Sequence, residues 1–222
     1  MALNTYTALG SAVADWLTRA GDPDLAARFP DFMALHEARM YDGAEASPTL
    51  GLPEMPGIRI PEMETVDASF AISNGVAQPT GFLELIQATL NTDNNPLDIV
   101  EQSVIDSYRT QALGAPTMIA VSGTGFRFKD DPGTGTYTVT LRYYAKLTSP
   151  SPTTDTNWIL TNAPGVYLNG CLFEAAKYLG DLEAAKLYAA QYASDVAGQN
   201  KRKNRVLNSA HNVRMRLRGR TP

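Results

Sequence analysis

Segments with a helical pattern lie at both ends of this 222-residue chain, and segments with a strand pattern lie between them. Apolar side chains recur every three or four positions in residues 5–20 and 30–41, which predicts two amphipathic helices. The same spacing predicts a second pair, over residues 164–179 and from Asp181 onward, with Asp181 as the N-cap. A short helix pair cannot bury its apolar stripes alone, so the two pairs are expected to pack on each other as one bundle.

The middle of the chain has the alternation and the turn residues of short β-strands. Residues 126–129 and 137–143 alternate between apolar and polar side chains on either side of a Pro-Gly turn, which predicts a β-hairpin with a long tip. The expected fold class is therefore α+β: a helical bundle, a β-rich platform and an extended C-terminal arm. A short helix is expected at residues 101–108, and further strands at residues 70–72, 82–86 and 117–121.

These elements divide the chain into five expected segments. The second segment, residues 42–61, is a loop that contains four prolines and is longer than most connections in a compact domain. The segments are the N-terminal helix pair of the bundle (1–41), a loop insertion (42–61), the β-rich platform (62–160), the C-terminal helix pair of the same bundle (161–197) and a basic C-terminal arm (198–222).

The charge of the chain is unevenly distributed. The net charge is −4, but the last 22 residues hold 8 of the 19 basic residues and no acid, which leaves residues 1–200 at a net −12. Basic arms of this kind bind acidic partners, such as nucleic acid, a membrane face or an acidic protein groove. Alternating arginines and apolar residues suit an extended segment that pairs with a partner surface. The candidate binding residues of the arm are Lys201, Arg202, Lys203, Arg205, Val206, Leu207, Val213, Arg214, Met215, Arg216, Leu217, Arg218 and Arg220.

Metal, cofactor and membrane sites are not expected. Two histidines and one cysteine are too few for a common zinc site, and His36-Glu37 lacks the second histidine of a zinc-protease helix, since residue 40 is Met. His36 is expected at a helix surface or partly buried, and Cys171 as a small buried hydrophobe. No apolar run approaches the ~18 residues of a membrane span, and the N-terminus has no secretion-signal pattern.

No catalytic arrangement is expected either. The sequences Gly123-Thr124-Gly125 and Gly133-Thr134-Gly135 lack the third glycine of a dinucleotide loop, so they are interpreted as turn glycines. Ser122 follows no glycine at position 120, so it does not stand in a nucleophile elbow. The sequence therefore indicates a protein that is not an enzyme.

A series of short motifs recurs in a fixed order along residues 5–197. The motifs stand at residues 14–17, 30–32, 37–39, 59 with 63–65, 82–85, 139–144, 157–160, 164–168, 174–179 and 181. In these motifs and their order, the chain resembles the head-to-tail adaptor proteins of tailed bacteriophages, of the tail tubular protein A type found in podoviruses. Two departures are an apparent insertion at residues 42–57 and Gln78-Pro79-Thr80-Gly81 in place of the commoner Leu-Pro-x-Asp.

The resemblance implies a structural virion protein, made in the host bacterial cytoplasm and located in the neck of the virion. Its copies would form a dodecameric ring that joins the portal to the tail nozzle and extends the DNA channel, with the C-terminal arm bound to the portal. DNA would pass without specific binding, and an acidic body suits such a channel because it repels phosphate. The alternative is a nucleic-acid-binding module that uses the basic tail, although no aromatic residues interleave with its arginines.

Overall fold

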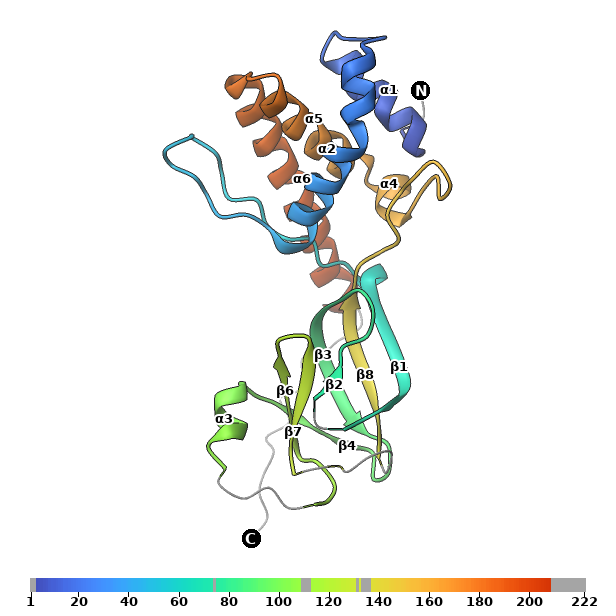
Figure 1. Cartoon of the computed structure of the whole chain (residues 1–222), viewed down its shortest axis with the longest axis vertical. Coiled ribbons are helices and arrows are strands. Elements are labelled where there is room, and N and C mark those ends of the chain that lie inside the picture. Colours follow the sequence, from blue (N-terminus) through green and yellow to red (C-terminus); the bar gives the residue numbers. More distant parts are fainter. Residues whose placement is uncertain (1–2, 74, 109–112, 131, 133–136, 209–222) are drawn as a thin grey trace. The chain divides into compact units, whose positions relative to one another are not determined.

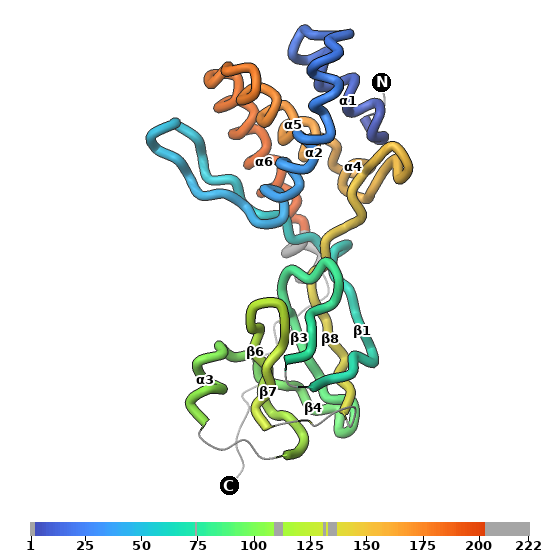
Figure 2. Tube along the Cα trace, viewed as in Figure 1, coloured from blue at the N-terminus to red at the C-terminus, as the bar shows by residue number. Residues whose placement is uncertain are grey.

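The chain folds into a helical unit and a β unit. The structure is a computed structural model that describes residues 3–73, 75–108, 113–130, 132 and 137–208. Residues 1–61 and 148–222 make up the helical unit, and residues 62–147 make up the β unit (Figures 1 and 2). The expected α+β class is confirmed.

The helical unit is built around α5. This helix contacts α1 and α2 from the N-terminal part of the chain and α4 and α6 from the C-terminal part. Its side chains are buried on most sides, including Cys171, which has no exposed surface, as expected of a small buried hydrophobe. The helices of this unit are α1 (Tyr6–Trp16), α2 (Pro23–Asp42), α4 (Trp158–Asn162), α5 (Pro164–Tyr178) and α6 (Leu182–Asn208) (Figure 1).

Helix α2 begins earlier than the sequence pattern predicted. The expected start at Pro30 is wrong, because the helix begins at Pro23 and continues through Pro30. Asp22 caps it, with Oδ1 accepting hydrogen bonds from the amides of Asp24 (3.0 Å) and Leu25 (3.3 Å). Proline fits the first position of a helix, whereas Pro30 removes one interior hydrogen bond. Buried side chains on both sides of Pro30, such as Phe29, hold the helix together across this loss.

Backbone hydrogen bonds order part of the expected loop at residues 42–61. Residues 44–55, called hairpin 44–55 below, are closed by two antiparallel bridges, Ala44–Met55 and Ser47–Leu52. Each bridge has two backbone hydrogen bonds of 2.7–3.0 Å. The tip of the hairpin lies against α6 of the same unit, where a Cβ atom at Gly51 would stand 3.2 Å from Lys186 Cε.

The β unit consists of two four-stranded sheets and a short helix, α3 (Gln102–Asp106). Strand β8 is central in the first sheet and pairs antiparallel with β1 and β3. The first sheet has the order β1 (Glu64–Ala71), β8 (Thr138–Ala145), β3 (Phe82–Leu90), β4 (Asn95–Pro96), and the second has the order β2 (Val76–Ala77), β7 (Gly125–Lys129), β6 (Met118–Ser122), β5 (Asp98–Ile99).

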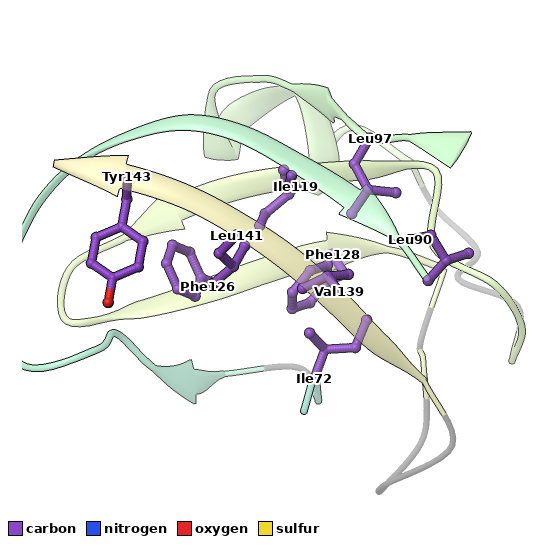
Figure 3. Packing of buried hydrophobic residues seen from close by; sticks show 10 residues of the cluster. Ile72, Leu90, Leu97, Ile119, Phe126, Phe128, Val139, Leu141 and Tyr143 are labelled. Atoms are coloured by element: carbon purple, nitrogen blue, oxygen red, sulfur yellow. The ribbon is translucent and has the colours of Figure 1, made fainter. Parts of the chain in front are cut away.

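The hairpin expected from residues 126–129 and 137–143 is not formed. Strand β7 pairs with β6 and β2, whereas β8 belongs to the other sheet. The two strands meet through side chains instead, because each turns its apolar face toward the same core. Most of the expected tip, residues 131 and 133–136, lies outside the described residues. The core cluster contains Ile72, Ala88, Leu90, Leu97, Ile119, Phe126, Phe128, Val139, Leu141 and Tyr143 (Figure 3).

Candidate interaction surfaces

The predicted basic arm begins as a continuation of α6. This helix runs to Asn208, so the expected end of helical structure near Gly198 is wrong. A cation-rich segment is favourable at a helix C-terminus, where the carbonyl dipoles point outward, and lysine and arginine are good helix formers. Lys201 is exposed. The side chains from Lys203 to Leu207, and all of Val213 to Arg220, lie outside the described residues.

The start of the arm is fixed to the helical unit by two side chains. Asn200 accepts a hydrogen bond from the amide of Arg59 (2.8 Å) and donates one to the carbonyl of Gly57 (3.0 Å). The guanidinium of Arg202 lies over the ring of Trp158, 4.7 Å from its centroid. Helix α6 is therefore held to the segment that follows hairpin 44–55 and to α4. Sequence reasoning had placed Arg202 only among the candidate binding residues.

A buried ion pair joins α2 to α5. Glu174 is almost fully buried and accepts hydrogen bonds from Arg39 (Nε 3.0 Å, Nη2 2.7 Å) and from Lys177 (3.0 Å). Both cations also lie 5.0 Å from the ring centroid of Phe173. Each charge is compensated within the fold, so this cluster is structural. A glutamate on the apolar face of the predicted helix over residues 164–179 is the sequence signal that indicates such a pair.

His36 lies deeper than predicted. It has no exposed surface, and neither ring nitrogen has a hydrogen-bond partner among the described residues. Its ring packs edge-on against Tyr167 and Tyr192 and fills the space above Gly170, where a Cβ atom would stand 1.9 Å from Nδ1. Burial and, secondarily, the charge of Arg39 lower the pKa of His36 from 6.5 to about 3. A neutral imidazole without partners or solvent acts as packing.

The residues considered for chemistry are not brought together. Cys171 is buried in the helical unit, where burial raises the pKa of its thiol and suppresses the reactive thiolate. Ser122 ends β6 in the β unit, at the turn that Gly123 makes with φ 55°. Within the described residues, no group of three histidine, cysteine or acidic side chains is placed to hold a metal ion. In the same part of the chain, no helix is long and apolar enough to cross a membrane.

Two grooves mark the outside of the helical unit. The α1–α2 groove, about 410 Å³, has a mostly apolar lining that includes Tyr6, Val13 and Phe29. The α2–α5 groove, about 370 Å³, is lined by Arg28, Asp31, Phe32, Leu35, Glu174, Lys177 and Tyr178. The α1–α2 groove is lined mostly by apolar and small residues, whereas the α2–α5 groove also holds two basic and two acidic side chains.

Comparison with known proteins identifies one family. The family described as SU10 adaptor protein matches residues 4–216, which includes the helices and strands of both units. No curated protein matches the chain. The matched range also extends past the described end of α6 into the basic arm.

Proposed function

We propose that this chain, which belongs to the SU10 adaptor protein family, joins the portal of a tailed bacteriophage to its tail. Membership of this family makes it a bacteriophage adaptor and a structural component of the virion. The finer proposal is a dodecameric ring of the tail tubular type, placed between portal and tail nozzle and extending the DNA channel. The observation that supports it is the family match over residues 4–216, which is nearly the whole chain.

The proposed portal contact is the basic arm. Asn200 and Arg202 anchor α6 within the helical unit, so the start of the arm has a fixed position there. Eight basic residues without an acid suit an acidic surface on the portal, and the interspersed apolar residues suit shallow pockets on it. A ring multiplies this contact, because attachment of one copy raises the effective concentration of the next arm.

The proposed channel role rests on charge. Residues 1–200 carry a net −12, and a negative wall repels the phosphates of a passing genome. We therefore expect DNA to pass without specific binding, and no membrane or cofactor to take part.

The test is a pull-down of the protein with portal. A chain that ends at Asn208 keeps every described contact of the helical unit but loses residues 209–222. We expect it to fold normally and to be lost from the portal fraction. Charge reversal at Arg214, Arg216 and Arg218 should weaken retention most at low salt, where ion pairs are least screened. Charge reversal at Arg127, an exposed residue of β7, is the control. Equal retention of the full and shortened chains would contradict a role of the arm.

The same variants test the alternative of a nucleic-acid-binding module. The observation in its favour is the basic composition of residues 201–222. A module of this kind would bind duplex or single-stranded DNA with a steep salt dependence that disappears on truncation at Asn208. We expect no such binding at physiological salt, because the acidic body opposes it.

A further inference from the structure

We propose that residues 198–202 of α6, called the α6 latch below, hold residues 57–60 in place and release them when the basic arm binds its partner. Residues 57–60 are called the entry segment, because they lead into the β unit, which begins at Glu62. The latch therefore couples the arm to the chain that enters this unit. Its use rests on the proposed portal contact, whereas its mechanics can be tested on the free protein.

Asn200 holds the entry segment through both polar groups of its side chain. Its Oδ1 accepts a hydrogen bond from the amide of Arg59 (2.8 Å), and its Nδ2 donates one to the carbonyl of Gly57 (3.0 Å). Backbone groups that lose contact with water need partners of this kind. The entry segment is also bonded to α2, because the amide of Ile58 donates to the carbonyl of Met40 (2.8 Å). Opening of the latch would thus free one attachment of the segment and leave the other.

The α6 latch is weakly attached to the rest of its helix. Val196 is the last buried side chain in the described part of α6. Gly198 follows it, is exposed, and has open space around its Cβ position. A glycine within a helix lowers the stability of the helix at that point relative to alanine. Gly198 is therefore suited to be a hinge between the packed part of α6 and the latch.

Arg202 makes the closed latch compete with binding of the arm. Its guanidinium lies over the ring of Trp158, 4.7 Å from the centroid. Arg202 is also a candidate binding residue of the arm, next to Lys201. Hydrogen-bonded pairs with the carboxylates of a partner are stronger than a contact with a ring at the protein surface. A partner that binds the arm from its first cations onward would therefore draw Arg202 away from Trp158. Asn200 lies in the same helical turn and would move with it.

The size and direction of the coupling follow from these contacts. Each of the two hydrogen bonds of Asn200 contributes about fivefold to the closing equilibrium, or roughly 25-fold together. Coupling between two binding events is reciprocal. If binding of the arm opens the latch, a substitution that opens the latch must strengthen binding of the arm. A substitution that favours the closed latch must weaken it.

Hydrogen exchange of the Arg59 amide, followed by NMR in the free full-length chain, tests the latch. Asn200→Ala should accelerate this exchange roughly tenfold or more. Gly198→Pro should do the same although it keeps Asn200, because proline breaks the helix. Gly198→Ala should slow the exchange about two- to fivefold. The matched control is Gln191→Ala, an exposed amide side chain of the same helix, and should change nothing. The amide of Ile58, which is bonded to α2, should change at most about twofold.

A double variant distinguishes the hinge from two independent local effects. Gly198→Pro/Asn200→Ala should exchange no faster at Arg59 than the single variants, because each of them already opens the latch. Effects that multiply in the double variant overturn the latch. Unchanged exchange at Arg59 in Asn200→Ala overturns it as well, as does an equal acceleration at Ile58. Gly198→Ala shifts the exchange in the opposite direction without breaking the helix, so the test does not depend on the proline variant alone.

The affinity of the same variants for the portal tests the coupling. We expect Asn200→Ala and Gly198→Pro to bind about two- to tenfold more tightly than the natural chain, and Gly198→Ala to bind more weakly. Gln191→Ala should bind as the natural chain does. Equal affinities of all variants, or the reverse order, overturn the coupling. If the natural chain does not bind the portal, the proposed function fails instead, and the exchange measurements on the free chain still decide the latch.

Discussion

The buried His36 predicts a pH dependence of stability that one substitution should remove. In the folded chain its pKa is about 3, because the ring is buried and lies near the charge of Arg39. In the unfolded chain an imidazole has a pKa of about 6.5. Between these values the unfolded chain binds a proton that the folded chain does not. The free energy of unfolding therefore falls as the pH falls through about 6.5, until the folded state also takes up the proton near pH 3.

The magnitude follows from the two pKa values. Each pH unit inside this window corresponds to ~1.4 kcal/mol per proton, so going from about pH 7 to about pH 5 should lower the free energy of unfolding by about 2 kcal/mol. In a His36→Phe variant this part of the pH dependence should vanish. Phenylalanine has a similar size and keeps the edge contacts to Tyr167 and Tyr192, but it has no proton to bind.

Urea unfolding followed by tryptophan fluorescence measures this effect in the helical unit, which contains His36. Both tryptophans of the chain, Trp16 and Trp158, belong to the helical unit, so their signal reports the unfolding of that unit. The comparison is between the slopes of stability against pH, so a change in the overall stability of the variant does not disturb it. If the His36→Phe variant loses stability between pH 7 and pH 5 as steeply as the natural chain, the reasoning about His36 is refuted.

Two further substitutions, each with a control substitution, test the contact between α2 and α5. Gly170→Ala should destabilise the helical unit by roughly 3 kcal/mol or more, because the new Cβ atom would overlap His36. Gly198→Ala has open space around the new Cβ atom in α6, so this control should stabilise the unit by up to ~1 kcal/mol. The same fluorescence assay in urea measures both, and similar effects of the two would argue against close packing at Gly170. Arg39→Ala should cost about 3 kcal/mol, because it leaves a buried carboxylate with one partner, whereas Arg28→Ala, in an exposed pair, should cost less than about 1 kcal/mol. Equal midpoints in urea for these two variants would disprove the structural role of the buried pair.

Local signals in the sequence correctly predicted where α5 and α6 begin. Asp181 caps α6 as expected, with Oδ1 accepting a hydrogen bond from the amide of Ala184 (3.0 Å), and α5 begins at Pro164. These features depend on a few neighbouring residues. Pro30 predicts the start of α2 wrongly, because Asp22-Pro23 is the stronger cap and first position.

The partners of the strands depend on contacts that local patterns do not encode. The alternation of residues 137–143 predicted a strand correctly, but not its neighbours. The register of β8 pairs Tyr144 with Glu64, far away in the sequence, and the expected neighbour β7 lies in the other sheet. A turn signal between two strands favours a hairpin, but burial of both apolar faces in one core determined the actual arrangement.

The interaction surfaces were predicted only in part. The charge bias of residues 201–222 indicated the basic arm, but the anchoring of its start by Asn200 carries no sequence signature. The α2–α5 groove combines residues from α2 with Lys177 and Tyr178 from α5, and no pattern within either helix indicates that they meet.

Two contacts of different kinds, a steric fit and an ion pair, set the register between α2 and α5. Both lie on the same face of each helix. His36 fits over Gly170, where a larger residue would collide, and Arg39 meets Glu174, where a missing cation would leave a buried charge. His36 and Arg39 are three residues apart on α2, and Gly170 and Glu174 are four residues apart on α5. The two residues of each helix therefore lie on the same helix face. A shift of one turn would place His36 against a side chain larger than glycine and separate the carboxylate from the guanidinium. Apolar packing alone tolerates such shifts, so these two contacts select a single arrangement. Since the α2–α5 groove is formed by the same two helices, its shape depends on this register.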